Sequence, residues 1–374
     1  MIYLDFNATT PLRPEALAAM AEAAREPGNP SSLHAAGQRA RLRVDGARAA
    51  VRALVGAPQA EVVLTGSGSE ANHIALLGQA RRSRGRRRVL VSAIEHPCIR
   101  LAAELLEAEG FGVEKVPVRA SGTFDLGALE ARLGPDVALV ALMLANDETG
   151  VVQPVAEAAA LAGRHGAALH TDAVQAAGKI AIDFSALGVT SLALAAHKLG
   201  GPRGMGALVL ASGVDPTPLW RGGPQEGGAR PGTQATVLAA GLAAAAGAAL
   251  AELPRSPAGA TRERLEGRLA RLHGALVIGA EAPRLPNTLA VGFVGVAAGR
   301  LVSALSERGI MVGAGAACHS GEARPSGVLT AMGVAPERAL EVVRLSTGWT
   351  TRDDEVDAAA EAIESAVGAL RKAA

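Results

Sequence analysis

The chain has 374 residues, of which 49% are hydrophobic and 20% charged, and its formal net charge is +1. This composition is typical of a globular protein, and the length is sufficient for one large α/β unit and a smaller second unit. A charge so close to zero creates no overall field that would attract nucleic acid or an anionic membrane, so direct binding to either is not expected.

The N-terminal segment carries neither a basic start nor a long apolar run, and no stretch of the chain reaches the ~18 uncharged apolar residues that a membrane span needs. The basic run Arg81–Arg88 lacks interleaved aromatic residues, which is typical of a solvated connection. The only cysteines, Cys98 and Cys318, are too few for a disulfide scaffold and too far apart for a zinc site. We therefore expect a cytoplasmic protein without a metal.

Short β-rich runs alternate with helical periodicity through the first two-thirds of the chain. Helices are expected at 14–26, 34–55, 69–82, 97–109, 126–133, 154–165 and 234–253, and strands at 61–65, 88–92, 112–116, 137–144, 167–171, 191–195 and 205–210. The alternation predicts βαβ crossovers around a mostly parallel, seven-stranded sheet flanked by helices.

The last third of the chain has a different order of elements. After a proline-containing linker at 254–259, we expect helices at 261–273, 300–308 and 354–371, strands at 288–293 and 342–346, and a Gly/Ala/Ser-rich loop at 313–327. This order is typical of a compact α+β domain. The sequence thus predicts a large domain at 14–253 and a small domain formed by 1–13 together with 254–374.

One apolar strand ends in His197 and Lys198, and a glycine-rich turn follows it. Lysine is costly to bury, so a lysine at the end of a core strand either extends its amine to solvent or carries out chemistry. Desolvation lowers the pKa of an amine and makes it nucleophilic enough to form a Schiff base with an aldehyde. Lys198 is therefore a candidate for holding an aldehyde cofactor.

The segment His170–Gln175 places Asp172 at the C-terminal end of another strand, where ligands of open α/β sheets bind. The aldehyde cofactor pyridoxal 5'-phosphate (PLP) withdraws electrons effectively only while its pyridine nitrogen is protonated, and a carboxylate partner maintains that state. Asp172 suits this task, and Gln175 suits a hydrogen bond to the ring hydroxyl. The alternative is that Asp172 only caps a following helix.

Two further segments follow predicted strands. The Gly/Ser turn of Thr65–Asn72 opens a helix, so its free N–H groups and the helix dipole suit a phosphate, although such turns also serve only as caps. The turn has neither the lysine of a Walker loop nor the GxGxxG spacing of dinucleotide folds. His96 lies just beyond a strand, where its imidazole is suited to stacking on a ring and to proton transfer; the alternative is an ordinary surface histidine.

The two cysteines lie in different settings. Structural cysteines usually occupy apolar faces, whereas Cys318 lies in a loop of small residues, which is the setting of a reactive thiol. An inert exposed cysteine is the alternative. Cys98 follows Pro97 on an amphipathic helix and is expected to be a packing residue.

Together these segments resemble the cysteine desulfurases of the NifS and IscS type, in the class V group of fold-type I PLP enzymes. The resemblance runs nearly end to end, through YLDFNATTPL, GNPSSLHAAGQ, TGSGSEAN, SAIEHP, LANDETGVVQP, HTDAVQ, AHKLGGPRGMGAL, RGGPQEGGARPGTQ, the Cys318 loop and VRLSTG. It implies an α/β fold with a large PLP-binding domain, a homodimer, and L-cysteine as the substrate.

The resemblance also implies a role for each matching residue. Lys198 would form the Schiff base, and Cys318 would be the nucleophile that accepts sulfur as a persulfide. Asp172 would pair with the pyridine nitrogen, Gln175 with the ring hydroxyl, and His96 would stack on the ring.

The remaining implied roles are contacts to the phosphate by Gly68, Ser69, His197 and, across a dimer interface, Thr233, and contacts to the substrate carboxylate by Asn146 and Arg344. The chain departs from the family at two positions. Ala195 replaces a usual hydroxyl residue, so one hydrogen bond to the phosphate is expected to be missing, and His319 directly after Cys318 is unusual.

The implied reaction converts L-cysteine to L-alanine and passes the sulfur to an acceptor protein, either an iron–sulfur scaffold or a tRNA-thiolation protein. Another class V activity, such as an aminotransferase or a selenocysteine lyase, is an alternative. So is a catalytically idle relative that acts as a scaffold, although the presence of Lys198, Asp172 and Cys318 together argues against it.

Overall fold

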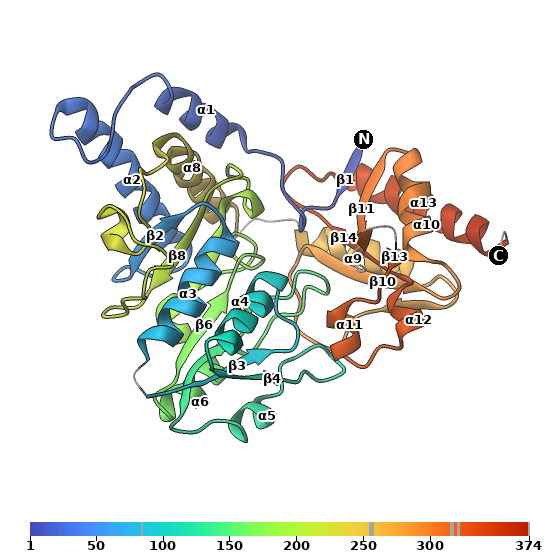
Figure 1. Ribbon diagram of the computed structural model, residues 1–374. Helices are drawn as coiled ribbons and strands as arrows, with labels where there is room; N and C mark the ends of the chain where they lie inside the picture. The colour runs from blue at the N-terminus through green and yellow to red at the C-terminus, as the bar shows by residue number, and fades with distance from the viewer. Residues whose placement is uncertain (84, 254–257, 315–317, 320–321, 373–374) are drawn as a thin grey trace.

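The computed structural model of the protein describes residues 1–83, 85–253, 258–314, 318–319 and 322–372. The chain forms two main sheets, each with its own set of helices (Figure 1).

The larger sheet has seven strands in the order β2-β8-β7-β6-β5-β3-β4. Neighbouring strands are parallel except at β8, which is antiparallel to both β2 and β7. The strands are β2 (Glu61–Thr65), β3 (Arg88–Ser92), β4 (Gly112–Val116), β5 (Val137–Ala141), β6 (Ala168–Asp172), β7 (Ser191–Ala195) and β8 (Gly206–Leu210). The prediction of a mostly parallel, seven-stranded sheet is confirmed, and β2, β3, β4 and β7 begin and end at the predicted residues.

Alternate side chains of the central strands enter different hydrophobic clusters, so both faces of this sheet are covered. In β7, Leu192 and Leu194 join the cluster that includes residues of α2 and α8, whereas Ala193 joins the cluster beneath α3. The helices are α1 (Pro14–Ala23), α2 (Ala35–Leu54), α3 (Gly68–Arg82), α4 (Pro97–Ala108), α5 (Leu126–Glu130), α6 (Val155–Arg164), α7 (Phe184–Leu187) and α8 (Thr236–Glu252). In Figure 1, α1, α2 and α8 pack together and α3 lies beside α4.

The smaller sheet has the order β1-β11-β14-β10-β9, and only the β1–β11 pair is parallel. Its strands are β1 (Ile2–Leu4), β9 (Ala275–Val277), β10 (Thr288–Phe293), β11 (Ile310–Ala314) and β14 (Val342–Ser346). One face packs against α9 (Ala258–Leu269), α10 (Ala298–Glu307) and α13 (Asp353–Lys372). On the other face, α11 (Gly327–Ala331) and α12 (Pro336–Ala339) pack with Ile94 and Met143 of the larger unit.

The predicted loop at 313–327 is wrong at both ends. Gly313 and Ala314 complete β11, and Gly327 begins α11. Glycine and alanine have low strand propensity, but β11 is held between β1 and β14, and this tertiary pairing overrides propensity. Within the segment, β12 (Cys318–His319) pairs with β13 (Glu322–Ala323). Residues 315–317 and 320–321 of the predicted loop lie outside the described residues.

The predicted linker at 254–259 lies partly outside the described residues, and its last two residues already belong to α9. Strand β1 places the N-terminus in the smaller sheet, with Ile2 opposite Ile310. This pairing agrees with a small domain made of 1–13 and 254–374, although the division at these residues stays a prediction. In the part of the chain that the structure describes, no helix is long and apolar enough to cross a bilayer. The cytoplasmic location also stays a prediction.

Candidate active site

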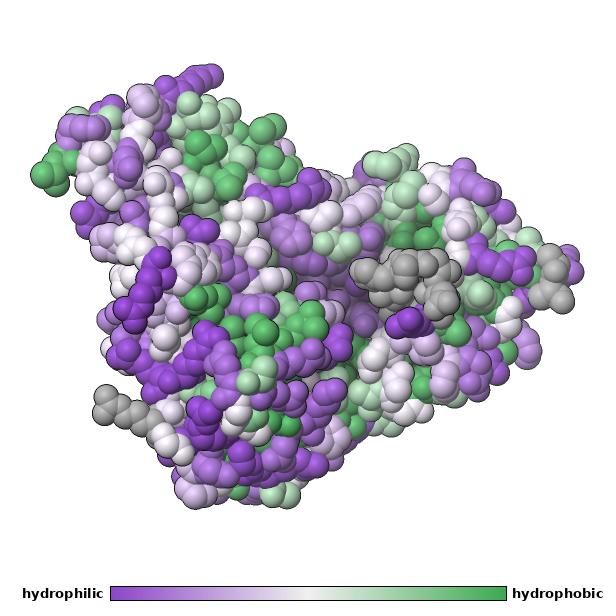
Figure 2. Space-filling view, viewed as in Figure 1, coloured by the Kyte–Doolittle hydropathy of each residue, from purple (hydrophilic) through white to green (hydrophobic). Residues whose placement is uncertain are grey.

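A cavity of about 210 Å³ lies at the carboxyl ends of the central strands. Its lining contains seven of the eleven predicted site residues, namely Gly68, Ser69, His96, Asp172, Gln175, His197 and Lys198. These residues come from the connections that follow β2, β3, β6 and β7. Because the carboxyl ends of these strands meet at one edge of the sheet, segments far apart in the sequence converge there. Figure 2 shows a recess between the two halves of the molecule, with hydrophilic residues on its visible walls.

Lys198 ends a single 3-10 turn, η1 (Ala196–Lys198), directly after β7. Its Nζ donates hydrogen bonds to the backbone carbonyl oxygens of Asn7 and of Ala8, the latter at 3.0 Å. Burial lowers the pKa of this amine from its ordinary value, so a larger fraction of it is neutral and nucleophilic. The predicted lysine is thus held inside the cavity, not extended to solvent.

Asp172 is the last residue of β6 and is buried. Its Oδ2 accepts a hydrogen bond from Nδ2 of Asn72 at 2.7 Å, and its Oδ1 accepts one from the N–H of Val174 at 2.9 Å. Burial raises the pKa of this carboxyl, and the two donors oppose the increase by favouring the charged form. Turns follow Asp172, so the alternative that it caps an adjacent helix is wrong.

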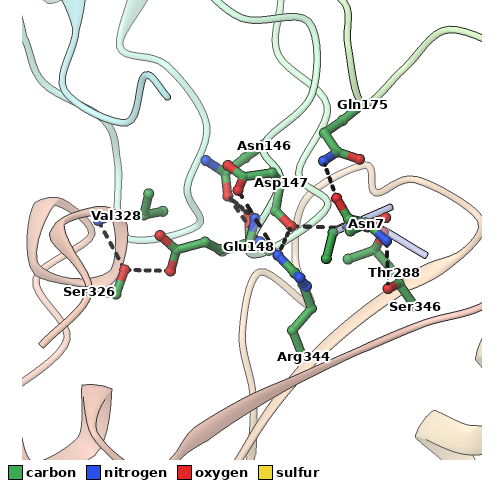
Figure 3. Close-up of polar contacts among 12 residues, drawn as sticks. Asn7, Asn146, Asp147, Glu148, Gln175, Thr288, Ser326, Val328, Arg344 and Ser346 are labelled. Atoms are coloured by element: carbon green, nitrogen blue, oxygen red, sulfur yellow. Dashed lines mark hydrogen bonds and ion pairs between the residues drawn. The ribbon is translucent and has the colours of Figure 1, made fainter. Parts of the chain in front are cut away.

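Asn7 connects several groups beside the cavity, and Figure 3 shows its contact with Gln175. Its backbone carbonyl accepts from Nε2 of Gln175 at 2.9 Å as well as from Lys198, and its Oδ1 accepts from Nζ of Lys179 at 2.9 Å. Lys179 also donates to Oε1 of Gln175 at 2.6 Å. With Oε1 held by Lys179, the amide nitrogen of Gln175 is the group left to donate toward a ligand.

The turn before α3 allows an anion to approach its backbone N–H groups closely. Ser67 caps the helix by accepting from the N–H of Glu70 at 3.0 Å, while the first N–H groups of a helix have no intrahelical acceptor. A Cβ added at Gly68 would lie 2.7 Å from Val174 and 3.2 Å from the Cβ of Ala195, so only glycine fits. The turn therefore offers N–H groups and the helix dipole to an anion.

His96 caps α4 through its ring, since Nδ1 accepts from the N–H of Cys98 at 3.2 Å. The thiol Sγ of Cys98 lies 3.0 Å from the same nitrogen and 3.3 Å from Nδ2 of Asn72. Burial raises the pKa of Cys98 to about 12, so the group is a thiol at neutral pH. Cys98 is buried as predicted, but it also lines the cavity and contacts two polar groups.

Arg344 reaches the site from β14 of the smaller sheet and lines an adjoining cavity of about 570 Å³, which also contains His96 and Asp147. Its Nη2 pairs with Oδ1 of Asp5 at 2.7 Å, and its Nη1 donates to the carbonyl of Asp147 at 3.2 Å (Figure 3). Nε of Arg344 is buried and has no hydrogen-bond partner among the residues that the structure describes. An unpaired buried donor is costly, so this edge of the guanidinium is suited to an incoming carboxylate.

Among the described residues, Asn146 and Thr233 do not line the first cavity. The side-chain amide of Asn146 is buried and already hydrogen-bonded to other residues of the protein. Its Oδ1 accepts from the N–H groups of Glu148 and Thr149, and its Nδ2 donates to the carbonyl oxygen of Ile94. Its contact with a substrate carboxylate stays a prediction. Thr233 is exposed on this single chain, and its contact with the phosphate of a partner subunit stays a prediction. The backbone of Cys318 is in β12, and its side chain lies outside the described residues.

Several residues of the site are not among the predicted ones. Asn7, Asn72 and Lys179 bind the predicted residues directly and are, or lie close to, members of the motifs quoted above. Their signal in the sequence is a polar side chain inside an otherwise apolar or glycine-rich segment. Such a signal marks burial without telling which partner the side chain meets. Asn72 lies 100 residues from Asp172 and Asn7 lies 168 residues from Gln175, whereas Lys179 is only four residues from Gln175.

Comparison with known proteins places the chain in a family. The aminotransferase class-V family model matches residues 2–359. An IscS-like cysteine desulfurase of Mycobacterium tuberculosis is 40% identical over 385 residues, covering 100% of this chain and 98% of the relative.

Solved structures agree. A NifS-like protein has a TM-score of 0.90 at 33% identity, covering 98% of this chain and 99% of its own. A structure described as SspA in complex with cysteine has a TM-score of 0.81 at 30% identity, covering 92% of this chain and 98% of its own. The chain therefore belongs to the aminotransferase class-V family and, within it, to the cysteine desulfurases of the NifS and IscS type.

Proposed function

We propose that this protein is a PLP-dependent cysteine desulfurase, which takes sulfur from L-cysteine and releases L-alanine. One observation carries the proposal: the Lys198 amine, the Asp172 carboxylate and the anion-binding turn at Gly68 converge on a single cavity. These three groups match the aldehyde, the pyridine nitrogen and the phosphate of PLP. The names of the relatives, and a structural neighbour described as a complex with cysteine, support the same reaction.

The residues present fit the cofactor in detail. Lys198 would hold it covalently, Asp172 would accept a hydrogen bond from the ring nitrogen, and Gln175 would donate to the ring hydroxyl. His96 would lie against the ring, and Gly68, Ser69 and His197 would contact the phosphate. Bound PLP supplies an aldehyde that captures an amine and a ring that accepts electrons from the captured amino acid.

The chain's own groups would then move the protons and the sulfur. Lys198, whose pKa is lowered by burial, takes the proton from Cα of the substrate. The Cys318 thiolate attacks the substrate sulfur, so an S–S bond forms while the Cβ–S bond breaks. The electron pair stays with the organic fragment, which takes up a proton and leaves as alanine. We propose that the persulfide sulfur passes to an iron–sulfur scaffold or a tRNA-thiolation protein.

The test of the function is direct. Purified protein incubated with PLP, L-cysteine and a reducing thiol is expected to produce alanine and sulfide in equal amounts. A parallel incubation with L-selenocysteine measures the preference between the two substrates. Alanine formed from pyruvate and an amino donor, with no sulfide from cysteine, would instead identify an aminotransferase.

Arg344→Lys is expected to raise KM for cysteine by about 10–100-fold with a smaller effect on kcat. The planar guanidinium with its unpaired Nε offers a two-point contact to a carboxylate, and lysine cannot make it; one charge-assisted hydrogen bond contributes about 1.5–3 kcal/mol. Steady-state kinetics measure both constants. Arg338→Lys, on α12, is the control with an unchanged KM, and an unchanged KM in Arg344→Lys would contradict the assignment.

Thr233→Ala is expected to weaken cofactor retention by about 1–3 kcal/mol, the contribution of one hydrogen bond to a charged group. We propose that the protein is a homodimer and that Thr233 reaches the phosphate in the partner subunit. Its segment is anchored near the phosphate turn, since Nε of Arg230 pairs with Oε1 of Glu70 at 3.0 Å. Equilibrium dialysis measures retention. Sedimentation that finds an active monomer at micromolar concentration would refute the shared site.

A further inference from the structure

His170 opens the HTDAVQ motif, yet the proposed function gives it no role. It lies in β6 and is fully buried, as are Asn72 on α3 and Ser191 on β7. These three polar side chains stand in a row beneath Asp172. Clusters of buried polar side chains are uncommon in protein interiors, because each group must be fully hydrogen-bonded to avoid a large free-energy cost.

The direction of each hydrogen bond in this row can be worked out from the carboxylate end. An ionised Asp172 only accepts, so Nδ2 of Asn72 at 2.7 Å must donate to it. Oδ1 of Asn72 then faces Nε2 of His170 at 2.9 Å and must accept. His170 therefore carries its proton on Nε2.

The contact of the other ring nitrogen of His170 is compatible with the same tautomer. Burial lowers the pKa of His170 to about 3, so the ring is neutral and holds a single proton. Nδ1 must then accept from the hydroxyl of Ser191 at 2.8 Å, and Ser191 Oγ in turn accepts from Nε2 of Gln79 at 2.7 Å. All four hydrogen bonds, from Gln79 to Asp172, point in one direction, toward the carboxylate.

We propose that His170 is a positioning residue of the cofactor site: its neutral ring, protonated on Nε2, orients Asn72 so that Asn72 donates to Asp172 and keeps that carboxylate ionised. The proposal deepens the proposed function and rests on it. Without the hydrogen bond from Asn72, burial would favour the neutral form of Asp172, and a neutral carboxylic acid does not keep the pyridine nitrogen of PLP protonated.

The other charged groups around Asp172 make this donor important. Asp147 raises the pKa of Asp172 and His96 lowers it. Glu95 is also close, and burial raises its pKa to about 8, so it is mostly protonated at neutral pH. Apart from the N–H of Val174, Asn72 is the hydrogen-bond donor that the described residues supply to this carboxylate.

Two substitutions of His170 distinguish the effect of losing the hydrogen bond to Asn72 from the effect of losing the volume of the ring. The amide nitrogen of glutamine reaches the position of Nε2, whereas that of asparagine reaches only the position of Nδ1. His170→Gln is therefore expected to preserve the donor to Asn72, and His170→Asn to remove it. Thermal unfolding of the apoproteins checks that both variants fold. If His170→Asn does not fold, Ser191→Ala replaces it, because this substitution removes the hydrogen bond to Nδ1 of His170 and leaves Asn72 unchanged.

The first measurement needs no cofactor. In the apoprotein labelled with ¹⁵N-histidine, the His170 signals, assigned by their loss in His170→Gln, are expected to show a neutral ring protonated on Nε2 from pH 5 to 8. A proton on Nδ1, or a charged ring in this range, would overturn the proposal whether or not the protein is a desulfurase.

The second measurement uses PLP labelled with ¹⁵N in the ring. Wild type and His170→Gln are expected to show a protonated ring nitrogen, and His170→Asn a shift toward the unprotonated value. The pH midpoint of the cofactor's visible absorption change should also rise by about 1 unit in His170→Asn, because a less electron-withdrawing ring lets the lysine-linked nitrogen keep its proton longer. Identical spectra in all three proteins, or equal loss in both folded variants, would overturn the inference. Failure of wild type to bind PLP would overturn the proposed function instead.

Discussion

Lys198→Ala is expected to lower the rate of alanine formation from cysteine by about 10³-fold, within the range for a lost proton-transfer group. The substitution removes both the amine that would hold PLP and the base that would take the Cα proton. Wild-type protein loaded with PLP should be yellow, and borohydride reduction followed by peptide mapping should place the pyridoxyl group on Lys198. The variant should show no such adduct.

Lys372→Ala is the matched control, because this exposed lysine lies at the end of α13 and far from the cavity. It should keep the wild-type rate and adduct. A Lys198→Ala protein that still turns over cysteine at the wild-type rate would mean that the lysine assignment is wrong.

Cys318→Ala is expected to abolish persulfide formation and to lower sulfide release by more than about 100-fold, since the other cysteine of the sequence, Cys98, is buried and its thiol is not suited to accept sulfur. The variant should still bind PLP and change its absorption spectrum when cysteine is added, because cofactor chemistry does not need Cys318. Mass spectrometry of the protein after brief exposure to cysteine measures the extra sulfur atom.

Cys98→Ala separates the two thiols. With its pKa raised to about 12 by burial, the Cys98 thiol is almost entirely protonated at neutral pH, and a protonated thiol is a poor nucleophile. Cys98→Ala should therefore keep the persulfide on the protein. The opposite pattern, in which Cys98→Ala loses the persulfide and Cys318→Ala keeps it, would reverse the assignment.

The larger sheet could be predicted from the sequence because its signals are local. Strands such as β3 and β7 are mostly apolar runs, and β3 also lies between two helices of more than ten residues, α3 and α4; buried parallel strands have this appearance. The smaller sheet was harder. β1 and β9 have only three residues each, and β11 ends in glycine and alanine, so these strands depend on partners distant in the sequence.

The candidate site shows the same division. Lys198, Asp172 and Gly68 were predictable because each lies at the end of a strand or within three residues after it, in a recognisable local motif. The contact of Asn72 with Asp172 was not, because the two side chains are 100 positions apart and only the packing of α3 on the sheet brings them together. The free Nε of Arg344 was equally hidden, since it depends on how β14 lies beside Asp5 and Asp147.

The pairing of β1 with β11 has a consequence for how the protein is made. Ile2 lies opposite Ile310, so β1 leaves the ribosome long before its partner strand and stays unpaired until residue 310 has been translated. At 5–20 residues per second this delay is about 15–60 s. Throughout that time Asp5 and Asn7 remain away from Arg344 and Ser346, which are translated later still. All strands of the larger sheet are therefore translated before β1 can pair, and the contacts of Asp5 and Asn7 with β14 form only afterwards.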